Sequence, residues 1–197
     1  MLPSRLTQAL AEKGEVLRAL LATFHLKEAE LQVFFRAFKQ EKILEVWAKK
    51  GENLYQLLKT YPICAASGEL GPKKKEGDKQ VPEGLYEIVA FNPESKYHLS
   101  LRLNYPNEYD LLHHSDKEKP GGDIYIHGGC ESVGCLAMTD EAMQEIFVLA
   151  WWAKEAKRGE ILCYIFPFRF NEVENWREMG ENRGVLAFWE ELEKMYE

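Results

Sequence analysis

The spacing of hydrophobic residues changes several times along the chain, and each spacing predicts a different element. Between residues 4 and 24, leucines recur at helical spacing, which predicts an amphipathic helix that is interrupted or bent near Gly14. Residues 31–38 and 43–48 are apolar runs of strand length on either side of a polar turn. That arrangement predicts a β-hairpin.

The middle of the chain predicts strands separated by long polar loops. Further strands are expected at residues 54–65, 86–91 and 97–103. The sequence Asn-Pro-Glu-Ser at 92–95 predicts the turn between the last two. The segment 66–81 is too polar to be packed, and the polar and aromatic segment 104–120 is another long connection. Loops of this length often form the rim of a functional site.

The last third of the chain predicts a short strand at 123–127 that runs directly into a pair of glycines. A helix is expected from Thr139 to Lys157, with Thr139 or Asp140 as its N-cap. A final buried strand at 161–166 precedes a mostly helical segment at 175–196. Because strands and helices do not alternate, we expect an α+β fold rather than a doubly wound one.

Composition narrows the class of protein. The chain has 197 residues, of which 46% are hydrophobic and 29% charged, as in a globular domain with a full core. Its formal net charge of −7 argues against a general nucleic-acid binder, because no basic surplus can neutralise phosphates. No apolar stretch approaches the length of a membrane span, and no export signal is visible at the N-terminus. The lysines at 73–75 are expected in a solvated loop.

The four cysteines are too few for a disulfide scaffold in a chain of this length. Cys64 and Cys163 each lie in an apolar run, which predicts buried, inert thiols in core strands. A bridge between these two is the alternative if the protein is exported. The other two, Cys130 and Cys135, lie in the segment that carries the candidate chemistry.

That segment, residues 127–135, combines a histidine, glycines, a serine and two cysteines at a strand-to-helix junction. A catalytic cysteine attacks as thiolate and needs a proton acceptor, and His127 can serve Cys135 because its reference pKa is about 6.5. Glycines at 128, 129 and 134 let the backbone turn tightly. The amides of Val133, Gly134 and Cys135 could converge as an oxyanion hole. The segment therefore predicts a cysteine nucleophile.

Three other interpretations of the segment are weaker. Zinc would be held by His127, Cys130 and Cys135, but no fourth ligand stands at a recognisable spacing. A phosphate-binding loop lacks the required Lys and Ser or Thr after Gly134. The third is a glycine-rich turn with buried cysteines. We therefore expect no metal and no cofactor.

Taken together, these residues resemble a known signature. His127 and Gly128, followed by Ser132, Gly134 and Cys135, are similar to the His-Gly and Ser-x-Gly-Cys motifs of L,D-transpeptidase catalytic domains of the YkuD type. Matching segments occur in the same order at 71–86, 104–110 and 121–128. With Cys130 and the sequence Ala-Met-Thr-Asp at 137–140, they resemble the YafK-like branch in particular.

The resemblance implies a β-sandwich-like catalytic domain with N- and C-terminal helices, which we expect as a helical extension at 1–28 and a domain at 29–197. It implies that Cys135 attacks a diaminopimelate carbonyl of a peptidoglycan stem peptide and forms a thioester. His127 would act as base and the Gly128 carbonyl would orient it. The residues expected to contact substrate are Tyr125, Ser132, Val133 and Gly134. It also implies a periplasmic or cell-envelope location, and we expect a monomer.

Two departures from common members leave the reaction open. Those members carry a histidine where this chain has Val133 and an arginine where it has Ala137. The missing arginine removes a bidentate partner for a carboxylate. The branch includes an amidase that releases lipoprotein from peptidoglycan, so hydrolysis is slightly favoured over transpeptidation. A non-catalytic wall-binding module and an unrelated thiol hydrolase are the alternatives.

Cys130 allows a further hypothesis. A disulfide between Cys130 and Cys135 would block the nucleophile and act as an oxidative switch. The alternative is a small side chain that packs under the loop.

Overall fold

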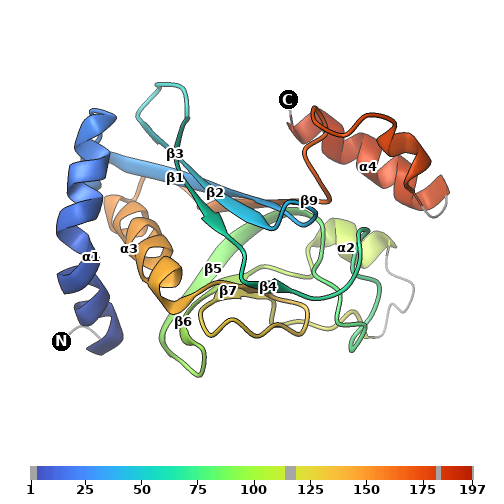
Figure 1. The fold of residues 1–197 in the computed structure, drawn as a ribbon, viewed down its shortest axis with the longest axis horizontal. Coiled ribbons are helices and arrows are strands. Elements are labelled where there is room, and N and C mark those ends of the chain that lie inside the picture. Colours follow the sequence, from blue (N-terminus) through green and yellow to red (C-terminus); the bar gives the residue numbers. More distant parts are fainter. Residues whose placement is uncertain (1–3, 114–118, 181–182, 197) are drawn as a thin grey trace.

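A computed structural model describes residues 4–113, 119–180 and 183–196 (Figure 1). The strands are β1 (Leu31–Phe38), β2 (Ile43–Lys50), β3 (Gln56–Pro62), β4 (Ala65–Ala66), β5 (Gly84–Ser95), β6 (His98–Leu103), β7 (Tyr125–His127), β8 (Leu136–Ala137) and β9 (Leu162–Phe166). The helices are α1 (Ser4–Thr23), α2 (Glu108–His113), α3 (Asp140–Ala156) and α4 (Arg183–Tyr196), with short 3₁₀ turns η1 (Glu28–Glu30) and η2 (Trp176–Glu178). The predicted α+β class is confirmed.

The strands form one sheet in the order β3-β2-β1-β9-β5-β6-β7-β8-β4. Only Ile63 and Cys64 separate β3 from β4, yet these two strands stand at opposite ends of that order. Because a residue advances the chain by at most about 3.6 Å, the ends of β3 and β4 lie within about 11 Å of each other. The sheet therefore curls back on itself, as the sandwich-like expectation requires.

The predicted hairpin is confirmed: β1 and β2 pair antiparallel from Leu31 opposite Lys50 to Phe38 opposite Ile43. On its other edge β1 pairs in parallel with β9, and β9 pairs antiparallel with β5. The N-terminal hairpin and the strands of the candidate site thus belong to one sheet, with β9 between them.

α1 and α3 lie side by side at one end of the molecule, and α4 lies at the other (Figure 1). α3 begins after Thr139, whose side-chain oxygen accepts a hydrogen bond from the Ala142 N–H at 3.2 Å, as the predicted N-cap requires. The buried leucines of α1 belong to the same core as α3 and the strands. The division of the chain at residue 28 stays a prediction.

The predicted interruption of the first helix is wrong, because α1 is continuous from Ser4 to Thr23. Gly14 is buried in it, and a Cβ built there would lie 3.3 Å from the Arg18 guanidinium and 3.9 Å from the Trp152 ring. The glycine therefore permits close packing of α1 on α3. This packing offsets the low helix propensity of glycine.

Two predicted strand boundaries are also wrong. β5 continues through residues 92–95 to Ser95, and the turn lies at Lys96 and Tyr97. Irregularities in the β5–β6 register accommodate the segment that contains Pro93, which has no N–H for the ladder. The strand expected at 54–65 ends at Pro62, where the chain crosses to the opposite edge of the sheet.

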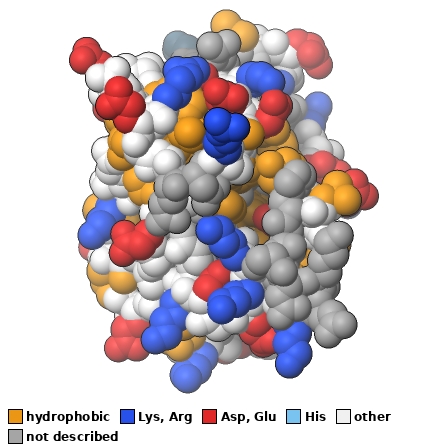
Figure 2. All heavy atoms as spheres, turned by 90° about the vertical axis from the view of Figure 1, so that its right-hand side faces the viewer, with side chains coloured by type: hydrophobic (Ala, Val, Ile, Leu, Met, Phe, Trp, Pro, Cys, Tyr) orange, Lys and Arg blue, Asp and Glu red, His pale blue; other side chains and the backbone are white. Residues whose placement is uncertain are grey.

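α2 lies within the segment that was expected to be a loop at 104–120, of which residues 114–118 lie outside the described part. None of the described helices is long and apolar enough to cross a membrane. Figure 2 shows acidic and basic side chains intermingled on the described part of the face that carries α4.

Candidate active site

The candidate site lies on one face of three neighbouring strands, β6, β7 and β8. In β7 and β8, which are parallel, Ile126 pairs with Leu136 and His127 with Ala137. Cys135 immediately precedes β8 and is therefore level with Tyr125. Since successive side chains alternate between the faces of a sheet, Cys135 lies on the same face as His127, one strand away and two residues along. Ideal strand spacing puts their Cα atoms about 8 Å apart.

His127 is held in a defined orientation. Its side chain is 4% exposed, and its Nδ1 lies 2.6 Å from the carbonyl oxygen of Gly128. A carbonyl oxygen can only accept, so Nδ1 carries the proton and Nε2 is left with the lone pair. Burial lowers the pKa of His127, and the hydrogen bond to Gly128 opposes that shift. A neutral imidazole with a free Nε2 is the form that a general base requires.

The surroundings of Cys135 favour the protonated thiol. Burial raises its pKa, while a hydrogen bond with the Tyr125 backbone and the positive charge of Lys73 act in the opposite direction. Its Sγ lies 3.7 Å from the carbonyl oxygen of Asp123.

Two backbone amides of the loop between β7 and β8 (residues 128–135, the nucleophile loop) already donate hydrogen bonds. The Gly134 N–H donates to Ser67 Oγ at 2.7 Å, and the Cys135 N–H donates to Ser132 Oγ at 3.1 Å. Ser132 in turn donates to the Cys135 carbonyl at 2.6 Å. The structure therefore does not present these two amides and that of Val133 as three free oxyanion donors. Ser132 shapes the loop, and the side chain of Val133 is exposed.

The loop at 66–81 packs against the nucleophile loop, although its composition predicted that it would not. Gly134 has a φ of +91°, and a Cβ there would lie 3.3 Å from the Gln80 carbonyl oxygen. Lys73, expected in solvent, is buried and bonds to the Asp78 carboxylate and the Lys75 carbonyl. The long loop thus forms a wall of the site, and it hydrogen-bonds both within itself and to residues such as Gly134 and Lys39 outside it.

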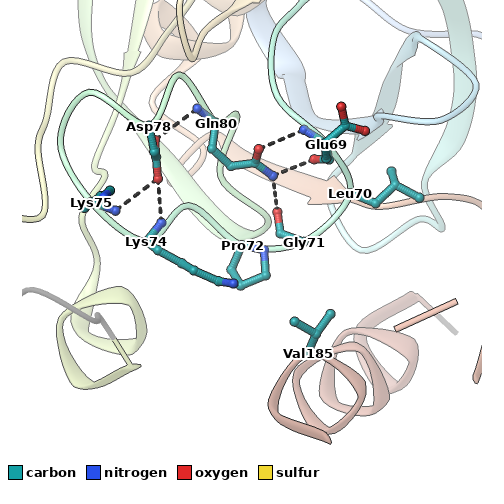
Figure 3. A pocket seen from close by; sticks show the side chains of 9 residues that line it. All are labelled: Glu69, Leu70, Gly71, Pro72, Lys74, Lys75, Asp78, Gln80 and Val185. Carbon is teal, nitrogen blue, oxygen red and sulfur yellow. Dashed lines mark hydrogen bonds between the residues drawn. The ribbon is translucent and has the colours of Figure 1, made fainter. Parts of the chain in front are cut away.

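Side-chain hydrogen bonds hold the loop in shape (Figure 3). Asp78 accepts from the backbone N–H groups of Lys74, Lys75 and Gln80 at 2.8–3.0 Å. The Gln80 amide reaches across to the backbone of residues 69 and 71. The hollow drawn in Figure 3 lies between this braced loop and Val185 of α4.

A buried ion pair anchors the end of the loop. Lys39 Nζ lies 2.9 Å from Glu83 Oε1 and also donates to the carbonyl oxygens of Gly71 and Val81 at 3.0 Å. The other carboxylate oxygen of Glu83 accepts from the indole N–H of Trp189 on α4 at 2.8 Å. The strand β1, the loop and α4 are therefore joined at one carboxylate.

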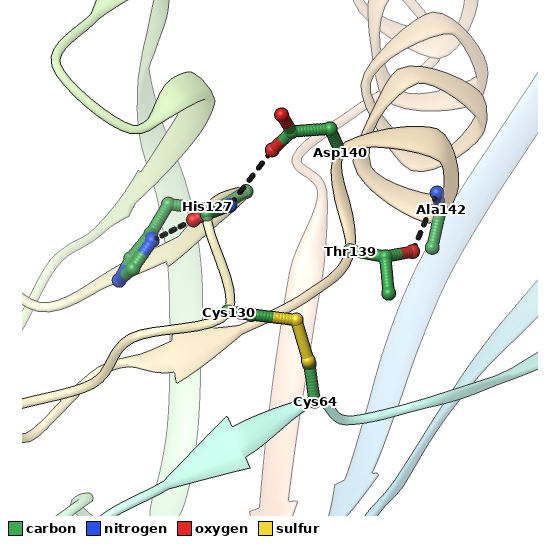
Figure 4. The surroundings of a disulfide bond; sticks show 8 residues. Cys64, His127, Cys130, Thr139, Asp140 and Ala142 are labelled. Carbon is green, nitrogen blue, oxygen red and sulfur yellow. Dashed lines mark hydrogen bonds between the residues drawn. A yellow bond between two sulfur atoms is a disulfide. The ribbon is translucent and has the colours of Figure 1, made fainter.

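A disulfide joins Cys64 to Cys130, with Cα atoms 5.2 Å apart (Figure 4). The predicted inert thiol at Cys64, its alternative bridge to Cys163 and the Cys130–Cys135 switch are therefore wrong. Cys163 is a buried free thiol, as expected. The pairing arises because the chain between β3 and β4 crosses beside the glycine turn, where the Cys64 N–H donates to the Ala137 carbonyl. It also removes the Cys130 sulfur from the candidate zinc ligands.

The glycine turn after His127 is fixed from several sides. The Gly128 N–H donates to the carbonyl oxygens of Tyr97 and Leu99, and the Gly129 N–H donates to Asp140 Oδ1 at 2.8 Å. A Cβ at Gly128 would lie 2.5 Å from that Asp140 oxygen, so a side chain cannot fit without displacement. The carbonyl that orients His127 therefore sits in a rigid turn.

The sequence identified His127, Gly128, Ser132, Gly134 and Cys135 as one site, and the structure places them together. It places Tyr125 level with Cys135 on the same face. Sequence reasoning missed three residues that lie beside the site: Ser67, which accepts from the Gly134 N–H, Tyr97, whose ring lies on that of His127, and Arg102 of β6, which pairs with Tyr125. Arg102 and Tyr97 are distant in sequence from the motif. They could have been found only from the register of β6 against β7.

Comparisons with known proteins agree with this geometry. Residues 35–150 match the model of the L,D-transpeptidase catalytic domain, YkuD. The chain is 36% identical over 167 residues to "Putative L,D-transpeptidase YafK" of Escherichia coli, in strains K12 and O157:H7. Those alignments cover 84% of this chain and 65% of the relatives, so the chain spans less than two thirds of their length.

Solved structures share the fold. The crystal structure of the helical cell shape determining protein Pgp2 from Campylobacter jejuni has a TM-score of 0.55 and 22% identity, over 71% of this chain and 49% of that one. Its K307A mutant also scores 0.55, with 21% identity, over 85% and 57%. The family match covers more than half of the chain and includes every residue of the candidate site. The chain belongs to the L,D-transpeptidase catalytic domain (YkuD) family.

Proposed function

We propose that the protein is a peptidoglycan-modifying cysteine enzyme that acts on diaminopimelate-containing stem peptides through a thioester on Cys135. The observation that carries this proposal is the placement of Cys135 and His127 on one face of β7 and β8, with His127 Nδ1 bound to the Gly128 carbonyl. That bond leaves Nε2 as the proton acceptor. Family membership and the names of the relatives support the choice of a cell-wall substrate.

The first half of the reaction forms the thioester. As Cys135 Sγ attacks the carbonyl carbon, Nε2 of His127 takes the thiol proton. The tetrahedral intermediate then expels the amine of the neighbouring residue, which receives that proton from His127. The carbon–nitrogen bond breaks, the carbon–sulfur bond remains, and the imidazole returns to its neutral form.

The second half regenerates the thiol. An acceptor attacks the thioester carbonyl while Nε2 of His127 takes its proton, and the departing sulfur recovers that proton. If the acceptor is an amine of another stem peptide, the product is a cross-link. If it is water, the enzyme is an amidase or peptidase, and wall-attached lipoprotein is one substrate of that kind. Hydrolysis is slightly favoured on the resemblance to the YafK-like branch alone, whereas the printed name of the relatives, "Putative L,D-transpeptidase YafK", is that of a transpeptidase.

The oxyanion requires donors that the resting site does not offer freely. The Cys135 N–H would have to release Ser132 Oγ, and the Gly134 N–H would have to release Ser67 Oγ, before either could bind the developing charge. The reacting substrate can cause these amides to change partner, because an oxyanion accepts a hydrogen bond more strongly than a serine hydroxyl does. Tyr125, Ser132, Val133 and Gly134 form the substrate-binding part of the proposal. The enzyme would work as a monomer in the periplasm or cell envelope.

The test is incubation with defined muropeptides and with peptidoglycan that carries attached lipoprotein, followed by mass spectrometry of the products. Loss of terminal D-Ala with dimer formation indicates transpeptidation, and release of lipoprotein-derived peptide indicates amidase action. Cys135→Ala should abolish either product. Cys163→Ala removes a buried thiol away from the site and should keep activity. If the parent protein changes neither substrate, or if Cys135→Ala behaves like the parent, the proposal is overturned.

A further inference from the structure

Three side chains stand in a row across the face that carries the nucleophile. Arg102 of β6 pairs with Tyr125 of β7, and Tyr125 is level with Cys135 at the start of β8. Directly paired residues point to the same face of a sheet, so all three side chains do so. Neighbouring strands lie about 4.8 Å apart, which puts the Arg102 and Cys135 backbones about 10 Å from each other. A long arginine side chain can cover much of that distance.

Arg102 has no established partner. Its side chain is exposed, and it makes no hydrogen bond or ion pair with any residue of the described ranges 4–113, 119–180 and 183–196. Lys73, a second cation near Cys135, is buried and bound to Asp78. A guanidinium is planar and presents paired donors that match a carboxylate. Lys79, whose backbone lies against Gly134, is a further exposed cation, but Arg102 is the one that strand register places in line with Tyr125 and Cys135.

The same arginine lines a hollow of about 430 Å³. Asn104, Tyr105, Gly122 and Asp123 also line this hollow. The carbonyl oxygen of Asp123 is the atom that lies 3.7 Å from Cys135 Sγ. Asp123 therefore both lines the hollow and lies next to Cys135 Sγ, so a substrate bound through its carbonyl at Cys135 can extend past Asp123 towards the hollow.

Tyr125 has an anionic neighbour, Asp123, and a cationic neighbour, Arg102. Its hydroxyl donates to Asp123 Oδ1 at 3.2 Å. Burial and the neighbouring Asp123 raise the pKa of Tyr125, whereas the charge of Arg102, which pairs with Tyr125 across β6 and β7, lowers it. A cation and an anion thus flank one tyrosine. This arrangement suits a group that carries both a carboxylate and an ammonium.

We propose that Arg102 binds the free carboxylate of the diaminopimelate side chain in this hollow and so selects stem peptides that carry it. This inference rests on the proposed function. Diaminopimelate has two amino-acid ends: one provides the carbonyl that Cys135 attacks, and the other keeps a free carboxylate and ammonium. The carbon chain between the ends allows both to be engaged at once. Ala137, two residues after the nucleophile, is fully buried and offers no charge for this role.

The experiment compares two stem peptides that differ at the third residue, one with diaminopimelate and one with lysine, which lacks the side-chain carboxylate. The parent should prefer diaminopimelate in kcat/KM, and Arg102→Met should lower kcat/KM for it about 10- to 100-fold, the loss expected for charge-assisted hydrogen bonds. Turnover of the lysine peptide should change little, so the ratio of kcat/KM for the diaminopimelate peptide to that for the lysine peptide should fall. Arg102→Lys should restore part of it. Arg158→Met, at an exposed arginine away from the hollow, is the matched control.

Binding to Cys135→Ala protein, measured by calorimetry, separates the two proposals. If Arg102→Met in that background abolishes the preference for diaminopimelate while the parent shows no turnover, the carboxylate site stands and the enzymatic function fails. If the parent turns over stem peptides but Arg102→Met keeps the same preference in both assays, the function stands and the carboxylate site is overturned. Absence of both binding and turnover overturns both.

Discussion

The ring of Tyr97 lies on the ring of His127, with 4.8 Å between their centroids and 33° between their planes. Tyr97 belongs to the turn between β5 and β6, the turn that the sequence placed a few residues too early. Its ring covers a histidine whose pKa is lowered mainly by burial. The tyrosine therefore helps to keep His127 neutral and able to accept a proton.

Tyr97→Ala should move the acid limb of the activity profile to higher pH. Exposure of His127 would raise its pKa from below 6.5 towards that ordinary value. The base form is required, so kcat/KM falls as the pH falls through this pKa, and the variant should lose activity at pH values where the parent keeps it. Profiles of kcat/KM against pH measure the shift. Tyr97→Phe keeps the ring and should follow the parent; if both variants shift alike, the ring is not the cause.

Alkylation of Cys135 should be slow at neutral pH. Burial raises the thiol pKa above its ordinary value of 9.0, and iodoacetamide reacts with the thiolate. The rate measured by intact mass should therefore keep rising beyond pH 9. Lys73→Met removes a charge that lowers this pKa, so it should slow alkylation further. A rate that levels off near pH 7 would instead indicate a thiolate–imidazolium pair and contradict the thiol assignment.

Replacement of both Cys64 and Cys130 by serine should lower the free energy of unfolding by about 2–5 kcal/mol, the usual range for a native disulfide. The bond closes a loop over a sequence separation of 66 residues, and without it the unfolded chain gains conformational freedom. Urea denaturation with and without reductant measures the change. Reductant should destabilise the parent and leave the double variant unaffected, and equal effects on the two would refute the assignment.

Glu83→Ala should destabilise the protein by about 3–5 kcal/mol, because it leaves the buried Lys39 ammonium without its counter-charge. It also removes the acceptor of the Trp189 indole and of the Gly71 N–H. Glu160→Ala, on the exposed surface, should change the free energy of unfolding by less than about 0.5 kcal/mol. If the Glu83 variant is as stable as this control, the ion pair does not hold the loop.

Local patterns explain which features were predictable from the sequence. The β1–β2 hairpin follows from two apolar runs around a polar turn, and the His127–Cys135 motif lies within nine consecutive residues. Both need only information from neighbouring positions. The turn at 92–95 failed because irregular pairing with β6 lets a proline-containing segment remain in a strand. Propensity at those positions was overridden by tertiary pairing.

Long-range pairings explain what was missed. The Cys64–Cys130 bond depends on a chain crossing between two edges of the sheet, and spacing alone does not determine disulfide connectivity. Lys73 is buried because residues distant from it in sequence close over the loop, not because of its lysine-rich neighbours. The position of Arg102 beside the candidate site follows from the register of β6 against β7. Each of these features appears only when segments far apart in the chain are brought together.

The position of β9 has a consequence for the order in which the protein can be built. β9 is the strand that pairs with both β1 and β5, although residues 162–166 are translated after every other strand. A nascent chain that lacks residues 162–166 has the β1–β2 hairpin and the strands of the candidate site, but β9 is not yet present to pair with β1 and β5 and so join them. The continuous sheet on which Cys135 and His127 lie is therefore completed only after β9 has left the ribosome.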